Sequence, residues 1–172
     1  MITQQRLREM LHYDAETGVF TWRIKRTAGV KPGDKAGCSN SLGYIIIGLT
    51  GRRYRAHRLA WLYVHGVWPE QSIDHANGIT GDNRMINLRE ATSSENRQNI
   101  ITVKTNTSGF TGVTQRKNER WEASIKINYK TIHLGSYASP ESAYHAYLVA
   151  KRQYHPFQPV PRSGVPMALI DQ

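Results

Sequence analysis

The stretch from Ile73 to Asn96 restricts the fold of this chain more than any other part of the sequence. It begins with a short apolar-led segment that ends in Asp74-His75, passes through a loop rich in Asn, Asp and Gly, and resumes with a second strand-like segment at Asn87. Asn, Asp and Gly favour tight turns, because they tolerate left-handed backbone or bind their own main chain. The pattern therefore predicts two short strands joined by a structured loop.

A helix is expected directly after the second strand. Thr92-Ser-Ser-Glu95 has the spacing of a capping box, so Thr92 is the expected N-cap and the helix begins at Ser93. This places Asn96 in the first turn of the helix. A strand end, a strand start and a helix can thus bring polar side chains to one point.

The side chains of Asp74, His75 and Asn96 are of types that together suit metal-assisted hydrolysis. The carboxylate of Asp74 and the amide oxygen of Asn96 are hard ligands that suit Mg²⁺ or Mn²⁺. His75, with an ordinary pKa near 6.5, can take a proton from water at neutral pH. A metal ion and a base are the equipment for phosphodiester hydrolysis. An Asp-His pair alone is commonly structural, so the interpretation depends on the spacing of the whole set.

Composition points to a polyanionic partner. Lys and Arg number 23 against 13 Asp and Glu, a formal charge of +10, while 39% hydrophobic residues are enough for a folded core. The single cysteine excludes an internal disulfide framework and paired zinc knuckles, so no structural zinc is expected. No apolar run approaches the roughly 18 residues of a membrane span and no signal peptide is recognisable. We expect a cytoplasmic protein without a membrane partner.

The N-terminal part is expected to be rich in short elements. Residues 5–12 have the spacing of a short amphipathic helix, and residues 19–22 favour a strand. Residues 43–50 and 54–57 predict a β-hairpin with a basic tip, followed by a helix from Arg58 to Gly66. Three arginines of this hairpin could follow DNA phosphates, although solvated charge explains them equally well: Arg52, Arg53 and Arg55. For His57 and His65 a structural role is favoured over metal binding.

A second module is expected after a linker at residues 100–107. Segments 112–116, 120–127 and 130–136 alternate as strands do and are separated by short turns, which predicts a three-stranded meander. Ser139-Pro140-Glu141 begins a helix that should lie across this sheet. The Pro-rich tail over 158–172 is expected to be extended or disordered. The predicted fold class is α+β.

Several basic residues lie on the strands and turns of the predicted meander. Strand alternation places Lys126 on the face opposite Ile125, hence on the open face of the sheet, while Arg120 and Lys130 lie near the turns. Such side chains can contact DNA phosphates, which gives salt-dependent affinity. The alternative is a basic face that is simply solvated.

Residues 54–99 resemble the HNH endonuclease family, and within it phage and intron-encoded homing endonucleases. The likeness is carried by the segments Ala56-His-Arg-Leu-Ala-Trp61, Ile73-Asp-His-Ala-Asn-Gly78, Asp82-Asn-Arg84, Asn87-Leu-Arg89 and Glu95-Asn96. It implies a ββα-metal core in which Asp74 and Asn96 hold one divalent ion and His75 is the general base. It further implies that Asn87 orients the His75 ring by a hydrogen bond. The family's usual final histidine is Asn96 here.

Residues 108–157 resemble the APETALA2/ERF-type DNA-binding domain. The matching segments are Ser108-Gly-Phe-Thr-Gly-Val113, Arg120-Trp-Glu-Ala-Ser-Ile125, His133-Leu-Gly-Ser-Tyr137 and Glu141-Ser-Ala-Tyr-His-Ala-Tyr147. The resemblance implies a sheet face that enters the major groove, with contacts from Arg116, Lys126 and His133. Thr111 and Thr114 stand where plant members carry arginine, so no sequence preference is transferred.

These observations predict a metal-dependent DNA endonuclease that nicks or cleaves duplex DNA, as monomer or homodimer, in the host cell of a phage or bacterium. The expected organisation is a nuclease domain over 1–99, the linker, a DNA-reading domain over 108–157 and the tail. Two alternatives remain open: a DNA-binding regulator whose nuclease site is silent, and a protein that binds or cleaves RNA.

Overall fold

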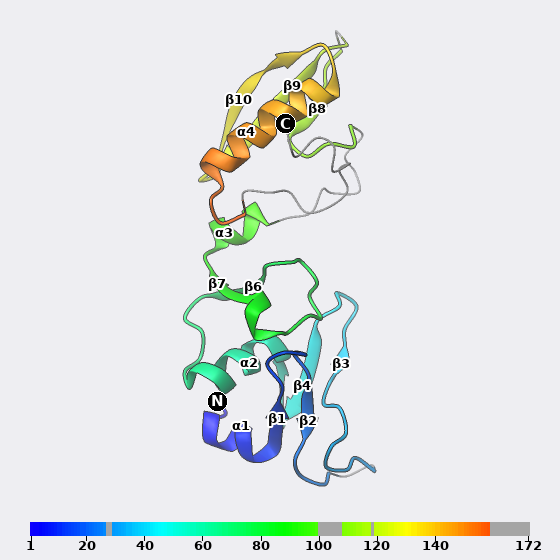
Figure 1. Ribbon diagram of the computed structural model, residues 1–172, viewed down its shortest axis with the longest axis vertical. Coiled ribbons are helices and arrows are strands. Elements are labelled where there is room, and N and C mark those ends of the chain that lie inside the picture. The colour runs from blue at the N-terminus through cyan, green and yellow to red at the C-terminus, as the bar shows by residue number, and fades with distance from the viewer. Residues whose placement is uncertain (27–28, 100–107, 118, 159–172) are drawn as a thin grey trace. The chain divides into compact units, whose positions relative to one another are not determined.

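The computed structural model describes residues 1–26, 29–99, 108–117 and 119–158. Within these ranges the fold is α+β, with four α-helices and small antiparallel sheets (Figure 1). The chain divides into two compact units, residues 1–92 and 93–172, which are described separately below. The expected linker over 100–107, and the expected tail apart from Gln158, lie outside the described residues. No helix in the described part of the chain is long and apolar enough to cross a membrane.

The N-terminal unit begins with a helix that runs directly into a strand. In α1 (Gln4–Met10) the Thr3 hydroxyl accepts a hydrogen bond from the Arg6 amide, and the helix ends at Met10 rather than at residue 12. Leu11–Tyr13 instead form β1, which pairs antiparallel with β2 (Phe20–Trp22). Residues 11 and 13 are buried and residue 12 is exposed, so tertiary pairing overrides the local helical pattern here.

A three-stranded sheet follows, and its last strand leads into α2 without a loop. The sheet has the order β3-β4-β5, with β3 (Cys38–Ser39), β4 (Ile45–Leu49) and β5 (Arg52–Arg55). The expected hairpin is therefore present, while β3 was not anticipated. The strand predicted to reach His57 ends at Arg55, because α2 (Ala56–His65) already begins at the next residue. Gly66, with a φ of 79°, ends α2 as expected.

The strand, loop and strand predicted after α2 are present. β6 (Ser72–His75) pairs antiparallel with β7 (Leu88–Ala91), so that Asp74 lies opposite Arg89 and His75 opposite Leu88. Asn87 does not open the second strand. It ends a 3₁₀ turn, η1 (Met85–Asn87), immediately before β7.

The elements of the N-terminal unit share one hydrophobic core. The side chains of α1, β1, β4 and α2 supply its most completely buried members, which are Leu7, Leu11, Ile47, Leu49, Leu59 and Leu62. The rings of Tyr13, Phe20 and Tyr63 pack against one another with centroids 4.7–6.2 Å apart. This core joins the β1–β2 hairpin to α2 and so provides a firm base for the β6–β7 hairpin.

The C-terminal unit contains the predicted meander and helix. Its elements are α3 (Ser93–Gln98), β8 (Val113–Gln115), β9 (Trp121–Ile127), β10 (Lys130–Tyr137) and α4 (Pro140–Tyr154). The strands form an antiparallel sheet in the order β8-β9-β10. Asn128 and Tyr129, both with positive φ, make the turn between β9 and β10.

The core of the C-terminal unit lies between the sheet and α4. Ala123 and Ile125 face Ala143, Tyr144 and Tyr147 in one cluster of buried side chains. Helix α4 begins where predicted, with the Ser139 hydroxyl accepting from the Ser142 amide and proline in the first turn. The separate cores of the two units explain why the chain divides into two bodies.

Candidate active site

Strand β6 brings the Asp74 and His75 side chains into the interior of the N-terminal unit. Asp74 is 9% exposed and His75 is 4% exposed. Asp74 lies opposite Arg89 across the hairpin, and Arg89 donates from Nε and Nη2 to Asp74 Oδ2 at 3.0 and 2.9 Å. This ion pair fixes the orientation of the Asp74 carboxylate.

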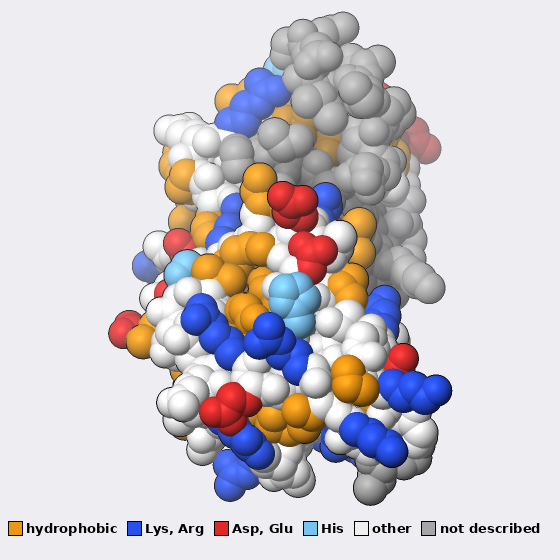
Figure 2. All heavy atoms as spheres, turned by 60° about the horizontal axis from the view of Figure 1, so that its bottom comes forward, with side chains coloured by type: hydrophobic (Ala, Val, Ile, Leu, Met, Phe, Trp, Pro, Cys, Tyr) orange, Lys and Arg blue, Asp and Glu red, His pale blue; other side chains and the backbone are white. Residues whose placement is uncertain are grey.

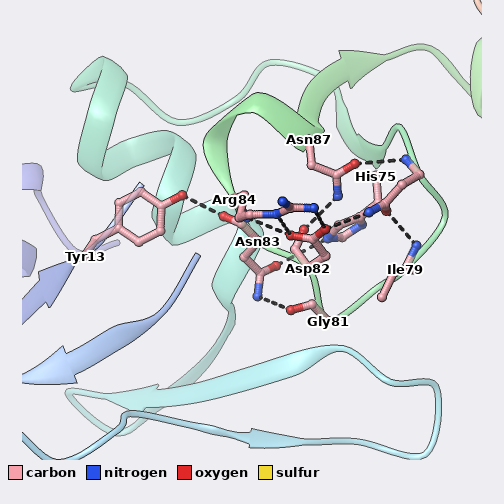
Figure 3. A network of polar contacts seen from close by, with 9 residues as sticks. Tyr13, His75, Ile79, Gly81, Asp82, Asn83, Arg84 and Asn87 are labelled. Atoms are coloured by element: carbon pink, nitrogen blue, oxygen red, sulfur yellow. Dashed lines mark hydrogen bonds and ion pairs between the residues drawn. The ribbon is translucent and has the colours of Figure 1, made fainter. Parts of the chain in front are cut away.

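Asn87 binds the loop between the strands rather than the histidine. Its Oδ1 accepts a hydrogen bond from the Asn77 amide at 2.9 Å, and its Nδ2 donates to the Asp82 carbonyl at 2.8 Å (Figure 3). The expected hydrogen bond from Asn87 to the His75 ring is therefore wrong. Both ends of the Asn87 amide are used by main-chain groups of the loop, so this residue shapes the loop.

One partner of the His75 ring is Asn83, a residue that sequence reasoning did not single out. His75 Nε2 lies 3.3 Å from Asn83 Oδ1, and Asn83 Nδ2 donates to the Gly81 carbonyl at 3.2 Å. Because the amide nitrogen is used by Gly81, the amide oxygen faces the ring and accepts the proton of Nε2. Asn83 is 2% exposed, so the contact is shielded from water.

The loop carries its own ion pair next to Asn83. Arg84 donates from Nε and Nη2 to the Asp82 carboxylate at 2.8 and 2.6 Å, and Asn77 Nδ2 donates to the same carboxylate at 2.6 Å. The Arg84 hydrogen bonds lower the pKa of Asp82 to about 2. The loop is therefore held by charge-assisted hydrogen bonds at its exposed edge and by the Asn87 amide inside.

The β1–β2 hairpin supports this loop from the N-terminal side. The Tyr13 hydroxyl donates to the Asn83 carbonyl at 2.6 Å, and the Met85 amide donates to the Ala15 carbonyl at 3.0 Å. Gly18, with a φ of +72°, lies so close that a Cβ there would meet the main chain of Asn83 and Arg84. Burial raises the pKa of the Tyr13 hydroxyl, which keeps it protonated as a donor. Nothing in the sequence near Gly18 indicates that this turn contacts the loop around Asn83.

A second histidine packs directly against His75. The rings of His57 and His75 meet edge to face with centroids 5.0 Å apart, and the Tyr44 ring lies 5.5 and 6.0 Å from them. Burial is the largest cause that lowers the pKa of His57 to about 3, and electrostatic interactions with His75, Arg55 and Arg58 act in the same direction. His57 is therefore uncharged at neutral pH. Its place in the first turn of α2, rather than at a strand end, is what aims it at the site.

The three arginines of the β4–β5 hairpin lie at different places. Arg52 and Arg53 are exposed at the start of β5, next to the Thr50-Gly51 turn. Arg55 is at the other end of the strand, where its guanidinium lies 4.7 Å from the Tyr44 ring centroid. Figure 2 shows Lys and Arg side chains spread over the face that it presents, with several of them near a histidine. Of the three arginines, Arg55 is the one that contacts Tyr44, whose ring packs against His57 and His75.

The predicted DNA-contacting residues of the C-terminal unit are exposed. Lys126 and His133 lie on the open face of the sheet, where they pair in register with Thr131 and Ser124. Lys130 is exposed at the β9–β10 turn. Two further members of the predicted set bind neighbours in the sheet: Arg116 forms an ion pair with Glu122 at 2.5 Å, and Arg120 donates to the Ser136 carbonyl at 2.8 Å.

Asn96 lies on α3, which groups with the C-terminal unit, and its role as a metal ligand stays a prediction. Among the described residues, no three His, Cys, Asp or Glu side chains gather as a metal cage. Mg²⁺ does not need such a cage, because it keeps several waters and takes one or two protein oxygens. A carboxylate such as Asp74 together with an amide oxygen fits such an ion.

Comparison with known proteins gives a match for part of the chain. Residues 54–98 match the model of the HNH endonuclease family. The match begins in β5 and ends with α3, so it includes Asp74, His75, Asn87 and Asn96. Neither a curated protein nor a solved structure matches the chain. The family match indicates nuclease activity on DNA, whereas the likeness of residues 108–157 to the APETALA2/ERF domain stays a prediction.

Proposed function

We propose that the protein is a metal-dependent endonuclease of duplex DNA, with His75 as the base that activates water. The observation that carries the proposal is the position of His75. Its ring is 4% exposed, lies at the end of a strand, is bound at Nε2 by Asn83, and falls in the segment that matches the HNH family. A histidine with one nitrogen fixed by an acceptor is oriented for proton transfer at the other.

The contact with Asn83 supports different roles for the two ring nitrogens of His75. An amide oxygen can only accept, so Nε2 carries the proton in this contact and the lone pair of the neutral ring is on Nδ1. Nδ1 then takes the proton of the attacking water. The resulting hydroxide forms the new bond to phosphorus while the bond to the 3′-oxygen breaks. Asn83 stabilises the imidazolium that results, because it still accepts from Nε2.

Asp74 and Asn96 would hold the divalent ion, Mg²⁺ or Mn²⁺. When bound, the ion would polarise the scissile phosphate and neutralise charge on the departing 3′-oxygen. In the chain itself, Arg89 keeps the Asp74 carboxylate turned toward one side through two hydrogen bonds to Oδ2. Asn87 maintains the loop that carries Asn83 by binding main-chain groups at Asn77 and Asp82.

Sequence choice is proposed to come from the C-terminal sheet. Its open face offers Lys126 and His133 to the DNA, with the other basic side chains of the sheet near phosphates, and the β4–β5 arginines would bind phosphates close to the cut. This division of labour suits a homing-type enzyme of a phage or bacterial host cytoplasm. One site cuts one strand, so a monomer nicks and a homodimer or two successive events give a double-strand break.

One observation favours a second candidate, a DNA-binding regulator without nuclease activity. The Arg89 guanidinium lies 2.9 Å from Asp74 Oδ2 and competes with any cation for that carboxylate. If the ion pair does not yield to a metal ion, the protein binds DNA without cutting it.

Nicking of supercoiled plasmid in Mg²⁺ or Mn²⁺ decides between the two functions. The wild type is expected to produce open circles, and His75→Ala is expected to lose this activity while its mobility-shift binding to DNA is retained. His65→Ala, which removes an exposed histidine at the end of α2, is the matched control and should nick normally. Binding without nicking by the wild type would establish the regulator, and preference for RNA of matched sequence would overturn the DNA assignment.

A further inference from the structure

Helix α3 is held in place by polar contacts. It has six residues and none of them is buried, so apolar packing does not hold it in place. It faces a cavity of about 660 Å³ that Ser94, Arg97 and Gln98 line together with Ile127 and Tyr154 of the C-terminal unit. The placement of such a short helix is therefore decided by its individual polar contacts.

One of these contacts comes from a buried lysine on α4. Lys151 is 3% exposed and lies one turn after the buried Tyr147. Its ammonium group donates to the carbonyl of Gln98, the last residue of α3, at 2.8 Å. A cation at this position is favourable, because the carbonyl groups at a helix C-terminus are unsatisfied and carry partial negative charge.

Lys151 has no acidic partner within the described part of the chain. A lysine is rarely buried without an ion pair, since desolvation of the ammonium is costly. Burial lowers the pKa of Lys151 to about 8. A methionine would fill the same space without this cost, so the core of the unit gives no reason for a lysine. Its contact with α3 does.

Two further contacts hold the same end of α3. The Phe157 amide donates to Gln98 Oε1 at 3.2 Å, and the Arg97 guanidinium lies 4.7 Å from the centroid of the Tyr129 ring, in cation–π distance. Both come from the C-terminal unit, one after α4 and one from the β9–β10 turn (Figure 1). The last turn of α3 is thus bound to three parts of that unit.

We propose that Lys151 is a positioning residue that fixes α3, and with it Asn96, to the C-terminal unit. The amide at position 96 then follows the sheet that reads the DNA, so that sequence reading and completion of the nuclease site are coupled through one buried ammonium group. The contact itself is independent of the proposed function, whereas its consequence for cleavage rests on it.

Amide hydrogen exchange of Lys151→Met tests the contact. The variant keeps the volume of the side chain and removes its buried charge, so the thermal unfolding temperature should stay equal or rise, while residues 93–98 exchange about tenfold faster, the size of one hydrogen bond to a charged group. Lys117→Met, which replaces an exposed lysine after β8, removes the same charge and should leave the exchange of α3 unchanged. Unchanged exchange of α3 in Lys151→Met, or equal acceleration in β8–β10, overturns the proposal.

A second variant avoids the core. Tyr129→Asn removes the exposed ring that faces Arg97 and keeps a residue type that tolerates the positive φ of this turn. It should accelerate exchange in α3 in the same direction and less strongly than Lys151→Met. No acceleration in α3 for this variant would contradict the assigned role of the Arg97–Tyr129 contact.

Nicking kinetics test the coupling. In Lys151→Met, kcat should fall about tenfold while KM for DNA stays at the wild-type value, because the DNA-reading face is untouched and only α3 is released. A kcat equal to that of the wild type, with α3 loosened, overturns the coupling. Absence of nicking in the wild type overturns the proposed function instead, and the exchange result then still decides whether Lys151 holds α3.

Discussion

At the scale of single residues, contacts with Asn83 and His57 orient the His75 ring. Asn83 binds one ring nitrogen, and the His57 ring packs against the imidazole edge to face. Neither neighbour could be identified from spacing. Asn83 stands in a loop whose composition predicts only a turn, and the role of His57 depends on α2 beginning two residues earlier than its apolar pattern indicates. The Asp74-His75 pair itself was visible, because a strand end followed by an Asn/Gly loop is a local signal.

The buried position of His57 predicts a pH dependence of stability. In the folded chain its pKa is about 3, whereas in the unfolded chain it is near 6.5, so the unfolded state binds the extra proton between these values. The contribution of His57 is complete above pH 6.5 and is lost progressively as the pH falls toward 3, by at most about 1.4 kcal/mol per pH unit. In His57→Phe, which keeps the ring and cannot titrate, the urea midpoint should fall less between pH 7.5 and 5 than in the wild type.

The exposed histidine at the end of α2 provides the control for this measurement. His65→Phe should reproduce the wild-type slope of stability against pH, because its side chain is exposed in the folded protein. An equal slope for His57→Phe and the wild type would show that His57 is not protonated on unfolding in the way described.

At the scale of elements, the β1–β2 hairpin and the loop between β6 and β7 form one structure. Tyr13 and Asn83 are 70 positions apart in the chain, yet the Tyr13 hydroxyl binds the Asn83 carbonyl at 2.6 Å. Local patterns predicted the β4–β5 hairpin, the end of α2 at Gly66, the start of α3 at Ser93 and the meander of the C-terminal unit. They did not predict β1 or β3, because these strands form only where a distant segment provides their partner.

A substitution at Gly18 tests how much the contact between the β1–β2 hairpin and the β6–β7 loop contributes to stability. In Gly18→Ala the new Cβ meets the main chain of Asn83 and Arg84, and the residue must also adopt a φ of +72°. Gly51→Ala has a similar backbone strain at a φ of +77°, but nothing lies within 4 Å of its Cβ. Gly18→Ala should therefore be less stable than Gly51→Ala by roughly 1–3 kcal/mol, measured by chemical unfolding. Equal stability of the two variants would show that the close approach is relieved at no cost.

At the scale of the whole molecule, a charge of +10 is carried by two units with separate cores. The charge was readable from composition and the two-part organisation from the change in pattern near residue 100. The division after Thr92 was not, because the capping box marks the start of α3 without showing which unit holds it. That information is in Lys151, more than 50 residues away.

Electrostatic binding of DNA predicts a measurable salt dependence. If Arg52 and Arg53 each neutralise one phosphate, the double variant Arg52→Gln, Arg53→Gln should reduce the slope of log K against log[salt] by about 2. Arg6→Gln, on α1 and paired with Glu9, removes an exposed arginine that has no assigned phosphate contact and should leave the slope unchanged. An unchanged slope in the double variant would mean that these arginines are solvated in the complex.

The attachment of α3 to α4 determines where chains of this kind can be recombined. A crossover at residue 100 would give α3 a foreign DNA-reading partner and leave Gln98 without the ammonium that caps it. A crossover at residue 92 would transfer α3, Lys151 and the C-terminal sheet together as one unit. Grafting a new target specificity onto this chain therefore calls for a junction before α3, inside the segment 54–98 that matches the HNH family, rather than after it.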